Sequence, residues 1–379
     1  MKPASKRPSV RKAHSSRWLL QIEQEIDQAR DAVDRACLRA KRVCLLAQQG
    51  RFALARRELV DLHALAFAQP NQRLAAWLSF AEGMMRQYVD LAGSAYEMMN
   101  RAYNIARAAQ LDDLFPLASA WMGQMAFARG DFQGVAAYVA QAIRVAAPDD
   151  HWARARAFSI VGLCYQFAAR QAQAAPWYAK ARAHASAMGD DASLSAWLYN
   201  WTVQSIHVAR HNHLRGLSVI PNEYALLLGT DSATNFDSSA GVESLPSLIP
   251  VHRALLFCMQ GDYGQALALY EEHLPAALTQ GLAHCAANLF ADVAWCRLNL
   301  GQREQALTHA QAAQDELGTC RDADDRAGAH SRLQQIYAAV GNAPRSEYHA
   351  DQAIANWKTF NESQDRVAAA LDTALKGLS

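Results

Sequence analysis

The small and apolar positions of the chain recur with a period of 40 residues and predict pairs of helices joined by tight turns. Gly261, Gly301 and Gly341 lie 40 residues apart, and Gly50 and Gly130 lie 80 apart. Glycine ends a helix at such positions because the tight turn needs a left-handed backbone conformation. Self-similarity at this length is typical of a solenoid of stacked helical hairpins, in which each hairpin buries its apolar face against its neighbours.

Alignment on the turn position divides the chain into eight units. The turn positions are Gly50, Asp90, Gly130, Ala169, Arg210, Gly261, Gly301 and Gly341. An aromatic residue and an alanine follow several turns at two and five positions, as Phe52 and Ala55 do. Seven residues before three of the turns stand Gly83, Gly123 and Gly162. Because a glycine inside a helix costs about 1 kcal/mol relative to alanine, this register predicts close approach of the two helices of a hairpin.

The repeat resembles the tetratricopeptide repeat family. In the fourth unit the family's signature positions are occupied in order by Phe158, Val161, Gly162, Tyr165, Ala174, Tyr178 and Ala181. The common tetratricopeptide unit has about 34 residues, and the longer units of this chain look like the MalT-type domains of bacterial signalling and transcription regulators. The resemblance implies an all-α, right-handed superhelical solenoid of about eight antiparallel helix pairs.

Four segments depart from the repeat. Residues 1–17 are basic, with two prolines and several serines, and predict a disordered tail. Residues 16–49 predict either one long helix or a capping helix that runs into the first unit. Residues 229–250 are rich in Ser, Asp, Gly and Pro and predict a loop insertion, either functional or disordered. Residues 362–379 predict a C-terminal capping helix, with a coiled-coil dimer contact as the alternative, so the array itself spans 18–361.

The composition of the chain indicates its cellular compartment and limits the classes of partner that it can bind. Apolar residues make up 51% of the 379, charged residues 19%, and the net charge is +1, which indicates a folded chain for which nucleic acid is an unlikely partner. Only the basic tail offers a weak contact to nucleic acid or anionic lipid. Seven cysteines without a CxxC pair favour a reducing compartment. No apolar run approaches the roughly 20 residues that span a bilayer. We therefore expect a cytoplasmic protein without a membrane partner.

A binding surface is predicted on the first helices of the units, which line the concave side of such a solenoid. Amides there can hold the backbone of an extended peptide while aromatic rings take its side chains. The alternative for each Trp or Phe is a place in the core between repeats. The predicted positions are Trp77, Phe80, Met84, Gln87, Tyr88, Gln124, Phe127, Arg156, Gln166, Phe167, Trp197, Asn200, Gln204, His207, Asn288, Trp295 and Asn299.

No motif of an enzyme is present, so we expect no catalytic residues and no cofactor. His207, His211 and His213 are the one cluster of residues whose spacing could suit a metal site. No acidic or cysteine ligand is near them in sequence, which favours a solvated turn and no metal. The leading hypothesis is a non-catalytic adaptor or regulatory scaffold that binds a protein or peptide. The alternatives are a sensor of a small ligand or signal peptide, as the MalT-type resemblance implies, and an assembly subunit that associates through its ends.

Overall fold

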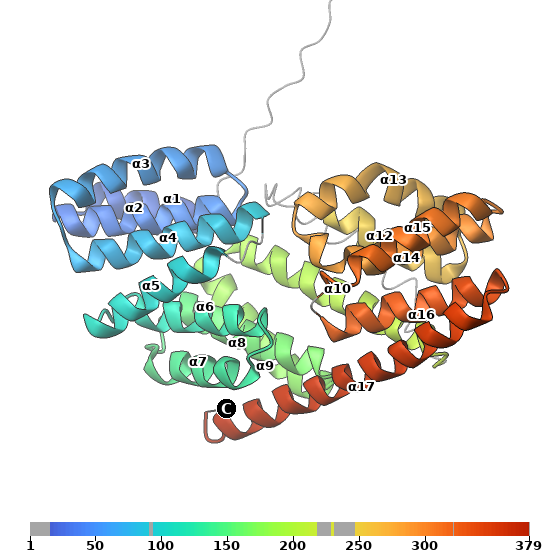
Figure 1. Ribbon diagram of the computed structural model, residues 1–379. Helices are drawn as coiled ribbons and strands as arrows, with labels where there is room; N and C mark the ends of the chain where they lie inside the picture. Colours follow the sequence, from blue (N-terminus) through green and yellow to red (C-terminus); the bar gives the residue numbers. More distant parts are fainter. Residues whose placement is uncertain (1–15, 91–93, 218–228, 231–246, 321, 379) are drawn as a thin grey trace, which may run out of the picture.

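The computed structural model describes residues 16–90, 94–217, 229–230, 247–320 and 322–378, and within these residues the regular structure is helical without strands. None of the described helices is both long and apolar enough to cross a bilayer. The helices, labelled in Figure 1, are α1 (Arg17–Gln28), α2 (Ala32–Gln48), α3 (Phe52–Ala68), α4 (Gln72–Asp90), α5 (Ser94–Ala108), α6 (Phe115–Phe127), α7 (Phe132–Val145), α8 (His151–Phe167), α9 (Gln171–Met188), α10 (Asp191–Leu214), α12 (Leu248–Gln260), α13 (Tyr263–Thr279), a short 3₁₀ helix η1 (Leu282–Cys285), α14 (Ala286–Asn299), α15 (Arg303–Glu316), α16 (Ala323–Ala339) and α17 (Ala343–Ala374).

The predicted turns are confirmed at six of the eight positions by the sign of the backbone angle φ. It is positive at the five turn glycines, Gly50, Gly130, Gly261, Gly301 and Gly341, and also at Ala169, where φ is 57°. A hydrogen bond of 2.9 Å from the Asp262 N–H to the Phe257 carbonyl closes one of these turns, and equivalent bonds close the others. Each bond occupies a carbonyl that the last turn of the helix leaves without an intrahelical donor.

Two turn positions were not confirmed. The prediction for Arg210 is wrong, because Arg210 lies inside α10 and is buried, and the left-handed residue after that helix is Gly216, with φ of 66°. Asp90 is the last residue of α4, and residues 91–93, which follow it, lie outside the described residues.

The glycines that precede the turns let paired helices approach closely. A Cβ atom at Gly83 would lie 2.9 Å from Met99 Cγ, and one at Gly123 would lie 2.9 Å from Val139 Cγ1. At Gly162 it would lie 3.0 Å from the Tyr178 ring. Each neighbour stands 16 residues after its glycine, so the same contact recurs in three hairpins. This explains why a residue that disfavours helices is kept at this register.

The N-terminal stretch forms two helices. Ser16 caps α1 by accepting a hydrogen bond from the Leu19 N–H, and Asp31 caps α2 by accepting one from the Asp34 N–H. Helix α1 packs against α2, so the capping-helix interpretation of residues 16–49 is confirmed and the single long helix is wrong. The first helix includes Arg17, which the sequence analysis had assigned to the tail; the remaining tail, residues 1–15, lies outside the described residues.

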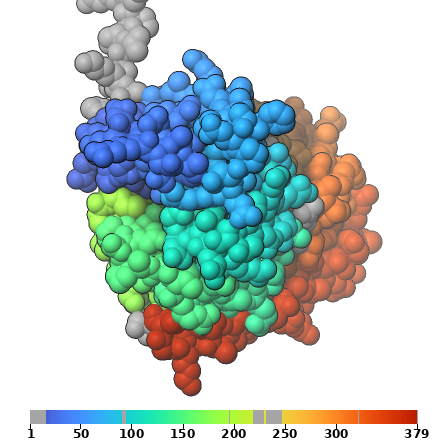
Figure 2. Space-filling view, turned by 90° about the vertical axis from the view of Figure 1, so that its left-hand side faces the viewer, coloured from blue at the N-terminus to red at the C-terminus, as the bar shows by residue number. Residues whose placement is uncertain are grey.

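Helix α17 runs without interruption from Ala343 to Ala374, so the predicted boundary at 362 is wrong. Its first part pairs with α16, and its C-terminal part crosses the molecule and packs on α7 and α8 (Figure 1). Figure 2 shows the same closure from the side, where the red C-terminal helix borders the green helices. Val367 and Leu371 are fully buried there. The C-terminal segment therefore covers the middle of the chain instead of capping the last repeat.

Helix α10 is the second link between the halves of the chain. It contacts α8 and α9 on one side and α12 and α16 on the other (Figure 1). Of the predicted 229–250 loop, residues 248–250 belong to α12, which corrects that boundary, while residues 231–246 lie outside the described residues. Gly229 lies against Thr202 of α10.

Candidate functional site

Three of the apolar residues predicted to line a groove in the first half of the chain lie in the core. Trp77, Phe80 and Met84 are fully buried, so the prediction that they face a partner is wrong. Trp152 of α8 stacks on Trp77, with ring centroids 6.2 Å apart, and Trp18 of α1 meets Trp152 edge-on at 4.8 Å. The reason is that α1 and α8 both contribute large rings to the space that an open array would leave as a groove.

Four further predicted positions are buried for different reasons. They are Arg156, Gln166, Trp197 and Asn288. The Arg156 guanidinium lies 3.9 Å from the Trp121 ring centroid and within 3.4 Å of the Tyr88 hydroxyl. The Gln166 amide accepts from the Tyr178 hydroxyl at 2.9 Å and donates to the Trp201 carbonyl at 3.4 Å. These polar groups are thus bonded within the protein, and they are not the open peptide contacts that we had predicted.

The remaining predicted positions keep part of their surface, and three of them share one face of α10. The half-buried set is Gln87, Tyr88, Gln124, Phe127, Phe167, Asn200, Gln204, His207 and Trp295, while Asn299 is exposed. Asn200, Gln204 and His207 follow one another at helical spacing. Trp201, which the sequence analysis did not select, is 40% exposed beside them. We call Asn200, Trp201, Gln204 and His207 the α10 surface.

The repeat alignment does not select Trp201 even with the corrected turn, because moving the turn from Arg210 to Gly216 shifts each position by six residues, whereas Trp201 lies four residues after Trp197. Trp197 and Trp201 are one helical turn apart, and the repeat alignment placed the inner face of the fifth unit on Trp197. Because the turn after α10 comes at Gly216 and not at Arg210, the alignment was wrong in this unit. Trp197 is buried in the hydrophobic cluster formed by α6–α9 and α17. The ring of Trp201 packs edge-on against that of Tyr178, with the ring centroids 5.5 Å apart, and Trp201 remains accessible to solvent.

A network of fully buried charges lies at the C-terminal end of α10. The side chain of Asp292 receives a hydrogen bond of 2.8 Å from Arg210 Nε at one carboxylate oxygen and of 2.8 Å from Arg332 Nε at the other. All three side chains are 1% exposed. The residues come from α10, α14 and α16, so one carboxylate joins three helices that are far apart in sequence.

Two acids, the half-buried Asp324 and the buried Asp325, follow at the start of α16. Burial raises the pKa of Asp324 to about 8 and that of Asp325 to about 7. The Asn288 amide donates to Asp325 at 3.0 Å, and His211 Nε2 lies 3.8 Å from Asp324. Near neutral pH a carboxylic acid in such a place is partly protonated, which lowers the cost of burying it.

The sequence interpretation of the three histidines as a solvated turn is wrong, because His207, His211 and His213 all lie within α10. Burial lowers the pKa of His207 to about 4 and keeps the pKa of His211 well below its ordinary value. The pKa of His252, whose ring lies 5.5 Å from His207, falls to about 3 for the same reason. These imidazoles are therefore neutral at physiological pH and contribute hydrogen bonds and packing, not charge.

Three potential metal ligands meet where α14 and α16 begin. One ligand atom from each of His284, Cys285 and Asp325 lies within 4.8 Å of the other two, and among the residues that the structure describes this is the one such group. His284 is exposed, and the other two are buried. His207, His211 and His213, for which the sequence analysis expected no metal, are not part of this group, and only the fold brings its three members together.

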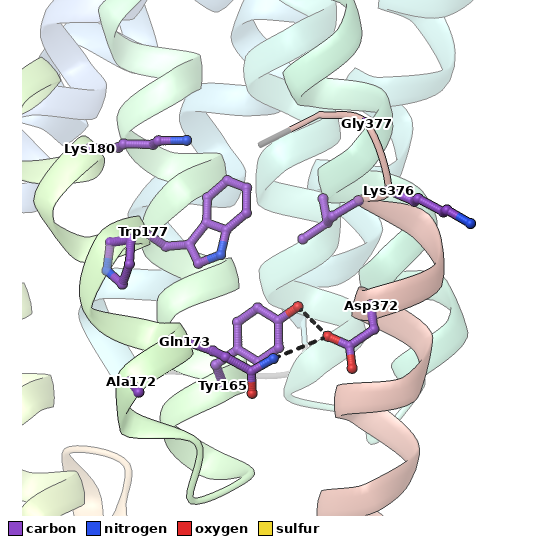
Figure 3. Close-up of a pocket in the computed structure, with 10 residues that line it drawn as sticks. Tyr165, Ala172, Gln173, Trp177, Lys180, Asp372, Lys376 and Gly377 are labelled. Carbon is purple, nitrogen blue, oxygen red and sulfur yellow. Dashed lines mark hydrogen bonds between the residues drawn. The ribbon is translucent and has the colours of Figure 1, made fainter.

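A shallow pocket lies between α17 and the α8–α9 hairpin. It has a volume of about 550 Å³ and lies beside Trp177, Lys180 and Lys376, as Figure 3 shows. Within it Asp372 accepts a hydrogen bond of 2.7 Å from the Tyr165 hydroxyl. The same carboxylate pairs with Arg170, which does not line the pocket, at 2.9 Å. Because its carboxylate already has protein partners, we interpret this pocket as part of the closing contact of α17.

A pair of buried histidines predicts how stability depends on pH. The Nδ1 atoms of His330 and His349 lie 2.8 Å apart, and burial lowers the pKa of both side chains to about 4. Between the ordinary pKa of about 6.5 and this value the unfolded state binds more protons, so the free energy of unfolding falls as pH falls. Arg326 and Arg345 face the pair and oppose protonation further.

We expect the His349→Gln variant to lose less thermal stability than the wild type when the pH falls from 7 to 5, as measured by circular dichroism melting. His309→Gln, which changes a partly exposed histidine on α15, is expected to keep the wild-type difference between the two pH values. An unchanged pH dependence in His349→Gln would contradict a depressed pKa at this pair.

Comparison with models of known protein families gives no match for the chain, and comparison with curated proteins gives none either. The arguments about function consequently rest on the residues and their geometry.

Proposed function

We propose that the protein is a non-catalytic binding module that holds a protein or peptide segment along the α10 surface. The observation that carries the proposal is the accessible Trp201 among Asn200, Gln204 and His207, on a helix between the two halves of the chain. Tryptophan contributes large contact area at interfaces, and flanking amides can bond a peptide backbone. The proposed architecture is a tetratricopeptide-like superhelix of 40-residue units, acting as an adaptor or regulatory scaffold in the cytoplasm.

The partner is best sought by covalent capture. A photo-crosslinking amino acid placed at Gln204 should capture a discrete partner from native cytosol. The same group placed at Ile354, which is 70% exposed on α17, serves as the control position and should not capture that partner. Equal capture at both positions would indicate non-specific contact.

Substitutions of Trp201 and Trp197, which lie one helical turn apart, then test the α10 surface. Trp201→Ala is expected to weaken binding of the captured partner by at least about 30-fold, because truncating a central aromatic at an interface costs about 2 kcal/mol or more. Its urea midpoint should stay close to that of the wild type. Trp197→Ala, by contrast, should lower the free energy of unfolding by about 3–5 kcal/mol, since Trp197 is a core residue. Unchanged affinity in Trp201→Ala would overturn the proposed surface.

A second candidate function, a ligand-responsive sensor, is favoured by the position of α10 between the halves. A ligand bound to a linking helix could favour one arrangement of the two halves over another. Small-angle scattering distinguishes the two functions, because a scaffold keeps its radius of gyration on binding and a sensor changes it.

A further inference from the structure

His284 and Cys285 end the 3₁₀ helix η1, directly before α14, and Asp325 lies near the start of α16. Gly281, with φ of 124°, directs the chain into η1, which ends at Cys285, directly before α14. Asp325 stands in the first turn of α16, which packs on α14. One ligand atom from each of the three side chains lies within 4.8 Å of the other two. We propose that these three residues bind a divalent cation of the zinc class, independently of the α10 surface.

The donor set selects the metal. An imidazole nitrogen, a thiolate sulfur and a carboxylate oxygen are the ligands that zinc takes in proteins, whereas calcium and magnesium take oxygen ligands. Zinc bonds of about 2.0–2.3 Å in a tetrahedron place the ligand atoms about 3.3–3.8 Å apart. The three atoms, which lie within 4.8 Å of one another, need to move by about 1 Å or less to reach this spacing.

Neighbouring groups already orient the ligands. His284 Nδ1 lies 2.8 Å from the Gly281 carbonyl, and by donating its proton there it leaves Nε2 with a lone pair. The Cys285 thiol donates to the Leu282 carbonyl at 3.2 Å, and this bond is lost when the thiol gives up its proton to bind a cation. The Asn288 amide donates to one oxygen of Asp325 at 3.0 Å. Such outer contacts fix the tautomer of a ligating histidine and the rotamer of a ligating carboxylate.

The charge of the site also fits a dication. Cys285 and Asp325 are each 6% exposed, and without a cation such buried groups can keep their protons and stay neutral. A bound dication replaces these protons. The nearby Arg210 is engaged by Asp292 and does not bond Asp325. One dication neutralises the thiolate and the carboxylate. Three protein ligands leave a fourth position for water, as the accessible His284 allows.

Cobalt(II) is the probe, because its tetrahedral complexes have strong visible bands and its bond to a thiolate adds a charge-transfer band in the near ultraviolet. The full chain, stripped with a chelator, should develop both bands with one equivalent of Co²⁺, and one equivalent of Zn²⁺ should abolish them. Cys285→Ser should lose the charge-transfer band. His284→Gln changes an exposed side chain, so we expect the variant to fold normally. It should weaken Co²⁺ binding at least about tenfold.

Cys320→Ser is the matched control, because Cys320 is a buried cysteine beside α16 that lies outside the group of three. It should keep the charge-transfer band. Loss of this band in Cys320→Ser with retention in Cys285→Ser would place the thiolate elsewhere and overturn the site. Absence of any band in the wild-type chain, or unchanged affinity in His284→Gln, would also overturn it.

Discussion

Replacing Asp292 with alanine is expected to lower the free energy of unfolding by about 3–5 kcal/mol, the cost of removing one partner from a buried ion pair. The reason is that Arg210 and Arg332 both donate to this carboxylate and both are 1% exposed, so the variant leaves two guanidinium groups buried without their counter-ion. The network joins α10 to α14 and α16, so its loss should also loosen the link between the halves. Urea denaturation followed by circular dichroism measures the effect.

Two comparisons isolate the buried charge. Glu271 pairs with Arg297 at 2.7 Å but is 57% exposed, so Glu271→Ala should cost less than about 1 kcal/mol. Replacing all three buried residues with apolar side chains of similar volume should recover much of the stability that Asp292→Ala loses, because no charge is then buried alone. A loss below about 1 kcal/mol in Asp292→Ala would mean that the network is hydrated in solution.

Leu371→Ala is expected to cost about 2–5 kcal/mol and to open the C-terminal part of α17 first. Leu371 is fully buried in the cluster that α17 forms with α7 and α8, and the substitution leaves a cavity at that contact. Urea denaturation gives the total effect. Hydrogen exchange gives its location: amides of residues 362–374 should exchange faster, and those of α12–α15 should keep their wild-type rates.

Ile354 offers the control on the same helix. It is 70% exposed, and Ile354→Ala should change the free energy of unfolding by no more than about 0.5 kcal/mol. If the two variants behaved alike, α17 would not be packed on α7 and α8 in solution, and the open array predicted from the sequence would be the better description.

The closure by α17 bears on the proposed function. An open solenoid presents the inner faces of all its first helices, whereas here rings from α1 and α8 fill the inner side of α4 and the second half of α17 covers α7 and α8. The α10 surface keeps an accessible tryptophan on the helix that links the halves. Closure thus narrows the candidate binding surface from a long groove to one helix.

The structure differed from the sequence predictions where distant contacts override a local pattern. The fifth unit illustrates this. Arg210 occupies the turn position by counting, yet it is held inside a 24-residue α10 by the carboxylate of Asp292, 82 residues further along the chain. No residue near Arg210 in the sequence indicates that Asp292 is its partner. The same applies to His284, Cys285 and Asp325, which no spacing rule connects.

The sequence by itself determined the helices, most of the turns and the register of the hairpins, because these depend on residues close together in the chain. A left-handed turn requires glycine or a residue that tolerates that conformation, and a close helix pair requires a small residue at a set distance from it. Only the tertiary structure decided which of the predicted binding residues stay accessible to solvent. It also decided that the C-terminal part of α17 packs on α7 and α8 and which charged side chains form ion pairs. Those outcomes depend on the packing and ion pairing of helices that lie far apart in the chain, as in the hydrogen bond between Tyr165 and Asp372, which are 207 residues apart. No local pattern encodes these contacts.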